Sequence, residues 1–226
     1  MRSEVRQWLA SFADTLGSGP VLEVGSLQVR GGGGVALADL RPLFPGRAYL
    51  GVDMRAGPGV DCLMDAHALA LPDCSVGTVL CLDTLEHIER PWQAVHEMYR
   101  VLRPGGWCVL ATVFAFAIHG HPCDYWRPTQ QGMAVLLQDF ATVWTGGDGG
   151  DMPRTVLGRG CKGETAPVTL PRSNDMDATA RVNPDHDGRR AVRGKPAATP
   201  APVPDPEPEQ QQPEPAAVEA DDKDGE

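Results

Sequence analysis

One short stretch of the chain concentrates side chains that can exchange protons or bind a polar ligand. The nine residues from 119 to 127 include two histidines, an aspartate, two aromatic residues and an arginine. An imidazole titrates near neutral pH and is therefore suited to act as a general base, so we expect His119 or His121 to deprotonate a substrate hydroxyl. The alternative is a structural loop whose aromatic residues cover the edge of a sheet. The expected substrate contacts in this stretch are Asp124, Tyr125, Trp126 and Arg127.

Acidic residues and a glycine stand at the ends of the predicted strands. An open parallel sheet binds its ligands at the carboxyl ends of its strands, near the point where the strand order reverses. A carboxylate at Asp53 can accept two hydrogen bonds from a ribose diol, and Gly25 lets a ligand approach the backbone because it has no Cβ. The structural alternatives are a loop cap at Asp53 and a turn cap at Asp65. The residues at these strand ends are Glu23, Gly25, Asp53, Asp65 and Asp83.

The elements that position these residues alternate between two periodicities. Short apolar runs predict strands, and apolar residues at helical spacing predict helices between them. This alternation predicts an α/β fold with a doubly wound, mainly parallel sheet. Residues 141–144 and 155–157 are predicted to form a closing hairpin. The predicted strands are 21–24, 48–53, 60–64, 76–82 and 107–114, and the predicted helices are 3–16, 91–102 and 129–140.

The charge divides the chain into two parts. The formal net charge is -10, and residues 196–226 hold nine acidic residues and a single lysine. Such a segment buries too little apolar surface to offset its ordering entropy, so we expect a domain at 1–171 and a disordered, proline-rich acidic tail at 172–226. The rest of the chain is nearly neutral and has no basic stripe. This argues against nucleic acid as the main partner.

Cysteine spacing and hydropathy argue against a metal-binding protein and a membrane protein. The six cysteines include no CxxC pair, so we expect no metal site. No apolar stretch approaches the roughly 20 residues that span a bilayer, so we expect a cytoplasmic protein without membrane contact. The sequence gives no expectation for the oligomeric state.

Several segments together resemble the successive motifs of a class I S-adenosylmethionine-dependent methyltransferase. The resemblance covers about residues 20–129, and the combination of LEH and VLRPGG behind an acid-ended second strand is its most specific part. It implies a Rossmann-like fold and S-adenosylmethionine as cofactor. The family's usual GxGxG loop is altered, because Gly25 is followed by SLQVR and a glycine run at 31–34. The segments are VLEVGS, GVDMRAGPGVD, DAHALALPD, LDTLEHIERPWQAVHEMYRVLRPGG and HGHPCDYWRPT.

The resemblance also implies roles for single residues. Glu23 and Gly25 would line the methionine part of the cofactor, and Asp53 would bind the ribose hydroxyls. Asp65 and Ala66 would border the adenine, Asp83 would lie close to the sulfonium, and His87 would contact the substrate, with a helix cap as the alternative for His87. The implied activity is methyl transfer to oxygen or nitrogen of a small molecule or glycan.

Two other functions compete with methyl transfer. A nicotinamide-dependent oxidoreductase would need a GxGxxG turn and a Tyr-x-x-x-Lys pair, and the sequence shows neither. A methyltransferase-like scaffold that binds partners without catalysis is the remaining alternative, because the first loop departs from the family pattern.

Overall fold

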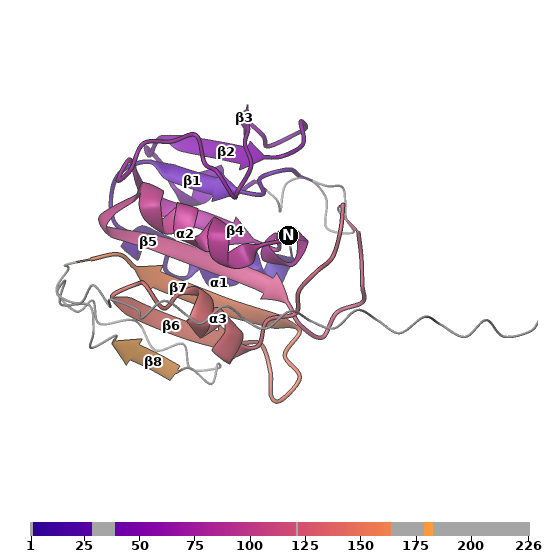
Figure 1. Cartoon of the computed structure of the whole chain (residues 1–226). Coiled ribbons are helices and arrows are strands. Elements are labelled where there is room, and N and C mark those ends of the chain that lie inside the picture. The colour runs from indigo at the N-terminus through magenta and orange to yellow at the C-terminus, as the bar shows by residue number, and fades with distance from the viewer. Residues whose placement is uncertain (1, 29–38, 121, 164–178, 183–226) are drawn as a thin grey trace, which may run out of the picture. The chain divides into compact units, whose positions relative to one another are not determined.

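The computed structural model describes residues 2–28, 39–120, 122–163 and 179–182. Their strands form an eight-stranded sheet with the order β3-β2-β1-β4-β5-β7-β6-β8 (Figure 1). The strands are β1 (Val21–Val24), β2 (Tyr49–Asp53), β3 (Cys62–Leu63), β4 (Val76–Leu82), β5 (Leu102–Val113), β6 (Thr142–Gly147), β7 (Thr155–Cys161) and β8 (Thr179–Val182).

The first five strands pair in parallel, which confirms the predicted Rossmann-like class. Strand β4 lies in the middle of the sheet and is buried at every position, as its uninterrupted run VGTVLCL predicts. Strand β5 begins at Leu102, five residues earlier than the predicted strand 107–114.

The other three strands add an antiparallel edge. Strands β6 and β7 form the predicted hairpin and are longer than expected. Strand β8 pairs with β6 inside the range 172–226, where the sequence predicts no element, because the four residues TARV have no periodicity to detect. The rest of that predicted tail lies outside the described residues.

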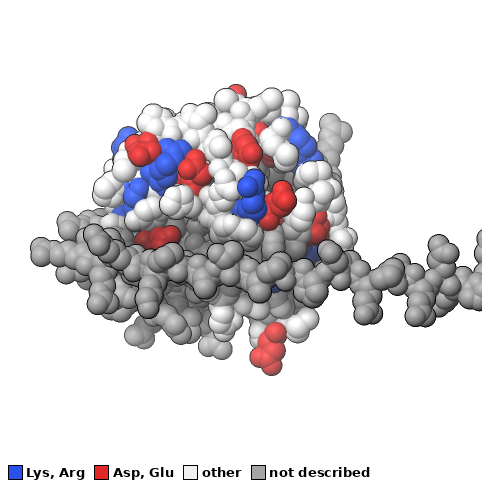
Figure 2. Space-filling model, in the orientation of Figure 1, with Lys and Arg blue, Asp and Glu red and all other residues white. Residues whose placement is uncertain are grey.

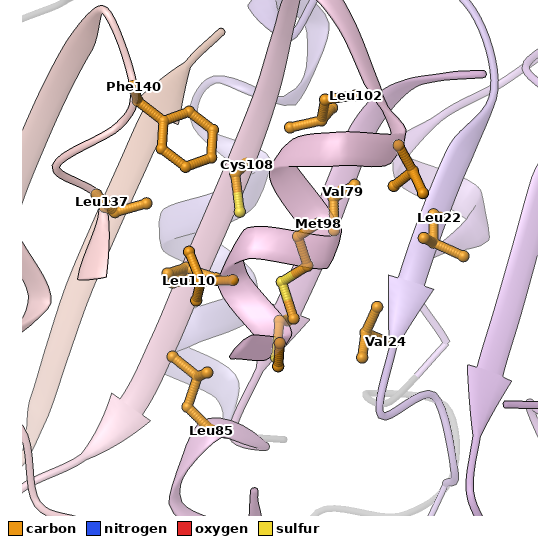
Figure 3. Close-up of a cluster of buried hydrophobic side chains, with 14 of the residues drawn as sticks. Leu22, Val24, Val79, Leu85, Met98, Leu102, Cys108, Leu110, Leu137 and Phe140 are labelled. Carbon is orange, nitrogen blue, oxygen red and sulfur yellow. The ribbon is translucent and has the colours of Figure 1, made fainter. Parts of the chain in front are cut away.

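Helices cover both faces of the sheet (Figure 1). On one face, α2 (Pro91–Val101) and α3 (Gln130–Leu136) pack against the sheet through the core side chains drawn in Figure 3, among them Met98 of α2 and Leu110 of β5. Helix α3 and the segment that follows it approach β7 closely, because Gly158 and Gly160 have no Cβ to meet Met133 of the helix and Phe140 after it. The small residues of β7 therefore determine how closely this helix packs.

Helix α1 (Ser3–Ala10) lies on the opposite face and is shorter than the predicted helix 3–16. Phe12 leaves the helical conformation, with φ of -145°, before a 3-10 turn at Ala13–Thr15. Its ring thereby lies 4.9 Å from that of Trp8, and Trp8 stacks on Trp144 of β6 at 5.8 Å. Arg159 of β7 is buried against Phe12 and Trp144, with its guanidinium 4.5 Å and 5.1 Å from their ring centres.

The described surface carries charges of both signs. On the face in Figure 2, basic and acidic side chains are interspersed over the described residues. Arg100 of α2, for example, forms ion pairs with Glu97 at 2.8 Å and Asp73 at 2.6 Å. In the described part of the chain, no helix is long and apolar enough to cross a bilayer.

Candidate functional site

The strand order reverses between β1 and β4. From β1 the sheet continues to β2 on one side and to β4 on the other, and sheets of this class bind their ligands in the crevice at the carboxyl ends of such strands. Gly25 follows β1 with φ of +81°, and a Cβ at this position would overlap the side chain of Thr84, which follows β4. The two loops therefore touch at the centre of the crevice, and the chain requires a glycine there for both space and conformation.

Replacing Gly25 with alanine is expected to lower the free energy of unfolding by about 2 kcal/mol, since both the left-handed backbone and the overlap with Thr84 oppose a Cβ. Urea denaturation measures this loss. In a Thr84→Ala background the penalty is expected to fall to about 1 kcal/mol, the part due to the backbone alone. An equal penalty in both backgrounds would show that the two loops do not touch.

Glu23 and Asp53 lie on the same face of the sheet. Glu23 is paired with Gly51 in the parallel register, and Gly51 and Asp53 are two residues apart on β2, so the three point to one side. Glu23 is buried and accepts a hydrogen bond of 2.6 Å from the Tyr49 hydroxyl. Burial outweighs this hydrogen bond and raises the pKa of Glu23 to about 7.

Asp53 holds the loops on both sides of it. Its Oδ1 accepts from the amide of Arg55 at 2.9 Å, and its Oδ2 accepts from the amide of Leu27 at 3.3 Å. A carboxylate has about four lone-pair positions, so each oxygen can accept a further hydrogen bond. Beside it, the buried hydroxyl oxygen of Ser26 has no hydrogen-bond partner among the described residues. Both groups can receive a polar ligand.

Asp65 and Ala66 follow β3 at the same edge of the sheet. Asp65 accepts from the amide of His67 at 2.8 Å and contacts its Nδ1 at 2.7 Å, which is the turn-capping arrangement considered as the alternative. The hydrogen bond from the His67 amide lowers the pKa of Asp65. Its side chain is two thirds exposed, and Ala66 packs against the core. A cap and a border to a ligand are compatible roles for this turn.

Asp83, directly after β4, is held by a residue that sequence reasoning missed. It adopts a left-handed conformation, with φ of +49°. Arg2 binds its carboxylate through Nη2 at 2.6 Å and through the backbone amide at 3.1 Å, and also donates to the hydroxyl of Thr155 at 2.5 Å. The segment before α1 therefore reaches the carboxyl end of β4 and the amino end of the antiparallel strand β7.

Three side chains from two segments converge beyond Asp83. Glu86 and His87 belong to the 3-10 helix η4 (Leu85–His87), and His119 lies in the loop after β5. One ligand atom of each lies within 4.8 Å of the others, and the rings of His87 and His119 are 4.8 Å apart. Glu86 is buried and accepts from the hydroxyl of Thr112 at 2.8 Å. Burial raises the pKa of its carboxyl. His121, the second predicted base, lies outside the described residues.

Asp124 and Arg127, both predicted to bind substrate, bind each other. Arg127 donates to Asp124 through Nη2 at 2.6 Å and also through Nη1. Asp124 accepts from the amide of His119 at 2.9 Å and contacts its Nδ1 at 3.1 Å. Hydrogen bonds from Arg127 hold the pKa of Asp124 well below its usual range, so the group is ionised. This pair positions His119.

Tyr125 and Trp126 are partly exposed next to this cluster. The amide of Tyr125 donates to the backbone oxygen of Glu86 at 2.7 Å, which holds the loop against η4. Trp126 donates from its indole nitrogen to the backbone oxygen of Glu89 at 3.1 Å, and its ring lies 5.9 Å from that of Trp92. The predicted substrate side of the site thus has an aromatic border.

Residues 17–110 match the family described as "Methyltransferase domain". This segment is a class I methyltransferase domain. A methyltransferase of Mycobacterium ulcerans (strain Agy99), described as uncharacterized, is 35% identical over 127 residues, which are 50% of this chain and 47% of that protein. One of Mycobacterium sp. (strain JLS) is 37% identical over 125 residues, with the same coverage. The chain spans about half the length of the curated relatives it matches.

Solved structures share the fold of the methyltransferase domain. The YcgJ protein of Bacillus subtilis has a TM-score of 0.53 at 16% identity, over 73% of this chain and all of that one. The CurJ carbon methyltransferase has a TM-score of 0.54 at 15% identity, over 73% of this chain and 54% of that one. These identities are low, so the two structures support the fold and not a shared substrate.

The methyltransferase domain offers a site that fits its family's cofactor. Gly25 is partly exposed beside Thr84 at the reversal of strand order, and Asp53 with the Ser26 hydroxyl supplies polar groups next to it. These are the groups expected to hold a nucleoside with a cationic tail. Of the residues that sequence reasoning left without a role, Glu86 was detectable as an acid four residues after a buried strand.

Proposed function

We propose that this chain transfers a methyl group from S-adenosylmethionine to oxygen or nitrogen of a small molecule or glycan. The observation that supports this most directly is the shared face of Glu23 and Asp53 beside the Gly25–Thr84 contact. Acidic groups from neighbouring parallel strands then surround one crevice at the reversal of strand order, where this class of sheet binds nucleosides.

The cofactor contacts follow the order of the strands. Asp53 would bind the ribose hydroxyls, while Asp65 and Ala66 would border the adenine. Glu23 and Gly25 would line the methionine part, and Asp83 would lie close to the sulfonium. When bound, S-adenosylmethionine supplies a methyl group on a positively charged sulfur, which the acceptor takes in exchange for a proton. Because Arg2 neutralises Asp83 in this structure, the cationic end of the cofactor and Arg2 would compete for one carboxylate.

The acceptor would lie against the loop that follows β5. His119 is the proposed catalytic residue, since it lies next to η4 at the sulfonium end of the crevice and is oriented by Asp124. His87 faces it from η4. Tyr125 and Trp126 present aromatic surface, which suits the apolar face of a sugar or a ring. Holding the acceptor in near-attack geometry is the main contribution that these residues would make to the rate.

Two measurements test the proposal. Calorimetry of the full chain with S-adenosylmethionine and, separately, with NAD should show binding of the first only. Mass spectrometry of cell extracts incubated with the chain and isotope-labelled cofactor should then show labelled methyl products. Binding of the cofactor without any labelled product from fractionated pools would favour the non-catalytic scaffold, and absence of binding would refute the proposal.

A further inference from the structure

The cluster of Glu86, His87 and His119 has the composition of a metal site. Two imidazoles and one carboxylate offer ligand atoms within 4.8 Å of one another, a separation that a single ion can bridge after small side-chain adjustments. The three residues come from η4 and from a loop 32 positions further along the chain. The cysteines form no CxxC pair and His119 lies far along the sequence from Glu86 and His87, which is why the sequence predicts no metal.

The carboxylate of Glu86 points to a ligand independently of the histidines. The side chain is 1% exposed, and Thr112 donates to Oε2 at 2.8 Å. The other oxygen, Oε1, is buried and has no hydrogen-bond partner among the described residues. A buried carboxylate oxygen without a partner is costly, and a cation next to it removes that cost.

Hydrogen bonds at Nδ1 orient both histidines for metal binding. Nδ1 of His87 lies 2.5 Å from the backbone oxygen of Cys123, which can only accept. Nδ1 of His119 lies 3.1 Å from Oδ2 of the ionised Asp124. Both contacts keep the proton on Nδ1 and place the lone pair of each ring on Nε2. Metal-ligating histidines in proteins have this second partner, a carbonyl or a carboxylate.

We propose that Glu86, His87 and His119 bind one divalent first-row transition metal ion. Imidazole and carboxylate ligands suit Mn²⁺, Fe²⁺, Co²⁺ and Zn²⁺, and three protein ligands leave coordination positions open. Neighbouring residues hold the ligands in place. Thr112 donates a hydrogen bond to Glu86, and Asp124 accepts one from the amide of His119. Arg127 in turn donates to Asp124.

The role of the ion rests on the proposed function. Asp83 precedes Glu86 by three residues, so the ion would lie between the sulfonium end of the crevice and the acceptor loop. An acceptor hydroxyl bound at an open position would lose its proton to water more readily, because a cation lowers the pKa of a bound hydroxyl. His119 would then act at the acceptor as a ligand of the ion.

Binding of Mn²⁺ tests the site in the absence of cofactor and acceptor. This ion prefers oxygen and nitrogen ligands, so it avoids the exposed thiols of Cys62, Cys74 and Cys123. The free-ion electron paramagnetic resonance signal of Mn²⁺ is titrated with the full chain. The wild-type chain is expected to bind one ion. Glu86→Gln and His119→Ala are expected to weaken binding at least tenfold, and His96→Ala, an exposed histidine of α2, is expected to bind like wild type.

A second measurement uses the wild-type chain alone, so it does not depend on whether the variants fold. Pulsed electron paramagnetic resonance of the bound Mn²⁺ should show hyperfine coupling to imidazole nitrogen in the wild-type chain. Absence of this coupling, or equal binding by Glu86→Gln, His119→Ala and wild type, overturns the metal site.

If methyl transfer proceeds in a chain that binds no metal, the proposed function stands and this inference fails. If the chain binds the metal but not the cofactor, the metal site stands and the proposed function fails.

Discussion

Replacing Asp53 with asparagine is expected to weaken the binding of S-adenosylmethionine about a hundredfold. The variant removes the negative charge that would accept two hydrogen bonds from the ribose diol, and hydrogen bonds to a charged group contribute about 1.5 to 3 kcal/mol each. A loss of about 2.7 kcal/mol corresponds to two orders of magnitude in the dissociation constant. Isothermal titration calorimetry on the full chain measures the effect.

The matched control is Asp73→Asn, which removes an exposed carboxylate that pairs with Arg100 and precedes β4, at the opposite end of that strand from Asp83. This variant should bind the cofactor like wild type. Because Asp53 also holds the amides of Leu27 and Arg55, the unfolding midpoint of the Asp53→Asn chain is compared with wild type before binding is interpreted. Unchanged affinity in a folded Asp53→Asn chain would contradict the ribose role.

The stability contributed by Glu23 is expected to fall as pH rises. Its folded-state pKa is raised to about 7, chiefly by burial, whereas its ordinary value is 4.5. The hydrogen bond from Tyr49 and the charge of Arg41 act in the opposite direction, and the charge of Asp39 adds to the rise. Between these two pH values the folded chain holds a proton that the unfolded chain has lost. This contribution is therefore complete below pH 4.5 and is lost as pH rises through 7, by about 3 kcal/mol in all.

Comparison with Glu23→Gln isolates this contribution from all other titrating groups. Urea denaturation of both chains from about pH 4.5 to about pH 8 gives the difference in unfolding free energy at each pH. The wild-type chain is expected to lose stability relative to Glu23→Gln across this range. A difference that stays constant with pH would mean that the carboxylate is ionised at little cost in the folded chain, in contact with solvent or a cation.

The parallel half of the sheet could be predicted from the sequence because its signals are local. The run 76–82 is apolar throughout, and β4 has these bounds in the structure. The same rule placed Glu23, Asp53 and Asp83 at one edge, since the carboxyl ends of parallel strands meet there. What the residues at that edge bind remains a prediction.

Contacts between segments distant in the sequence could not be predicted from the sequence. Nothing local to Arg2 indicates that it binds Asp83, because the pairing depends on where α1 lies on the sheet. Glu86 and His119 lie 33 positions apart and meet only through the path of the loop after β5. The spacing of Asp124 and Arg127 permits a local ion pair, although their residue types equally favour substrate contact.

Four of the five tryptophans form two pairs that serve as optical probes of separate regions, and the fifth, Trp107, is buried in β5. Trp8 and Trp144 stack across the boundary between α1 and the sheet, so their emission would report whether the first helix is seated. Trp92 and Trp126 lie at the surface near the loop that follows β5, where their fluorescence would be open to collisional quenchers such as iodide. Ligand-induced rearrangement at either region could thus be followed in real time without attaching a dye.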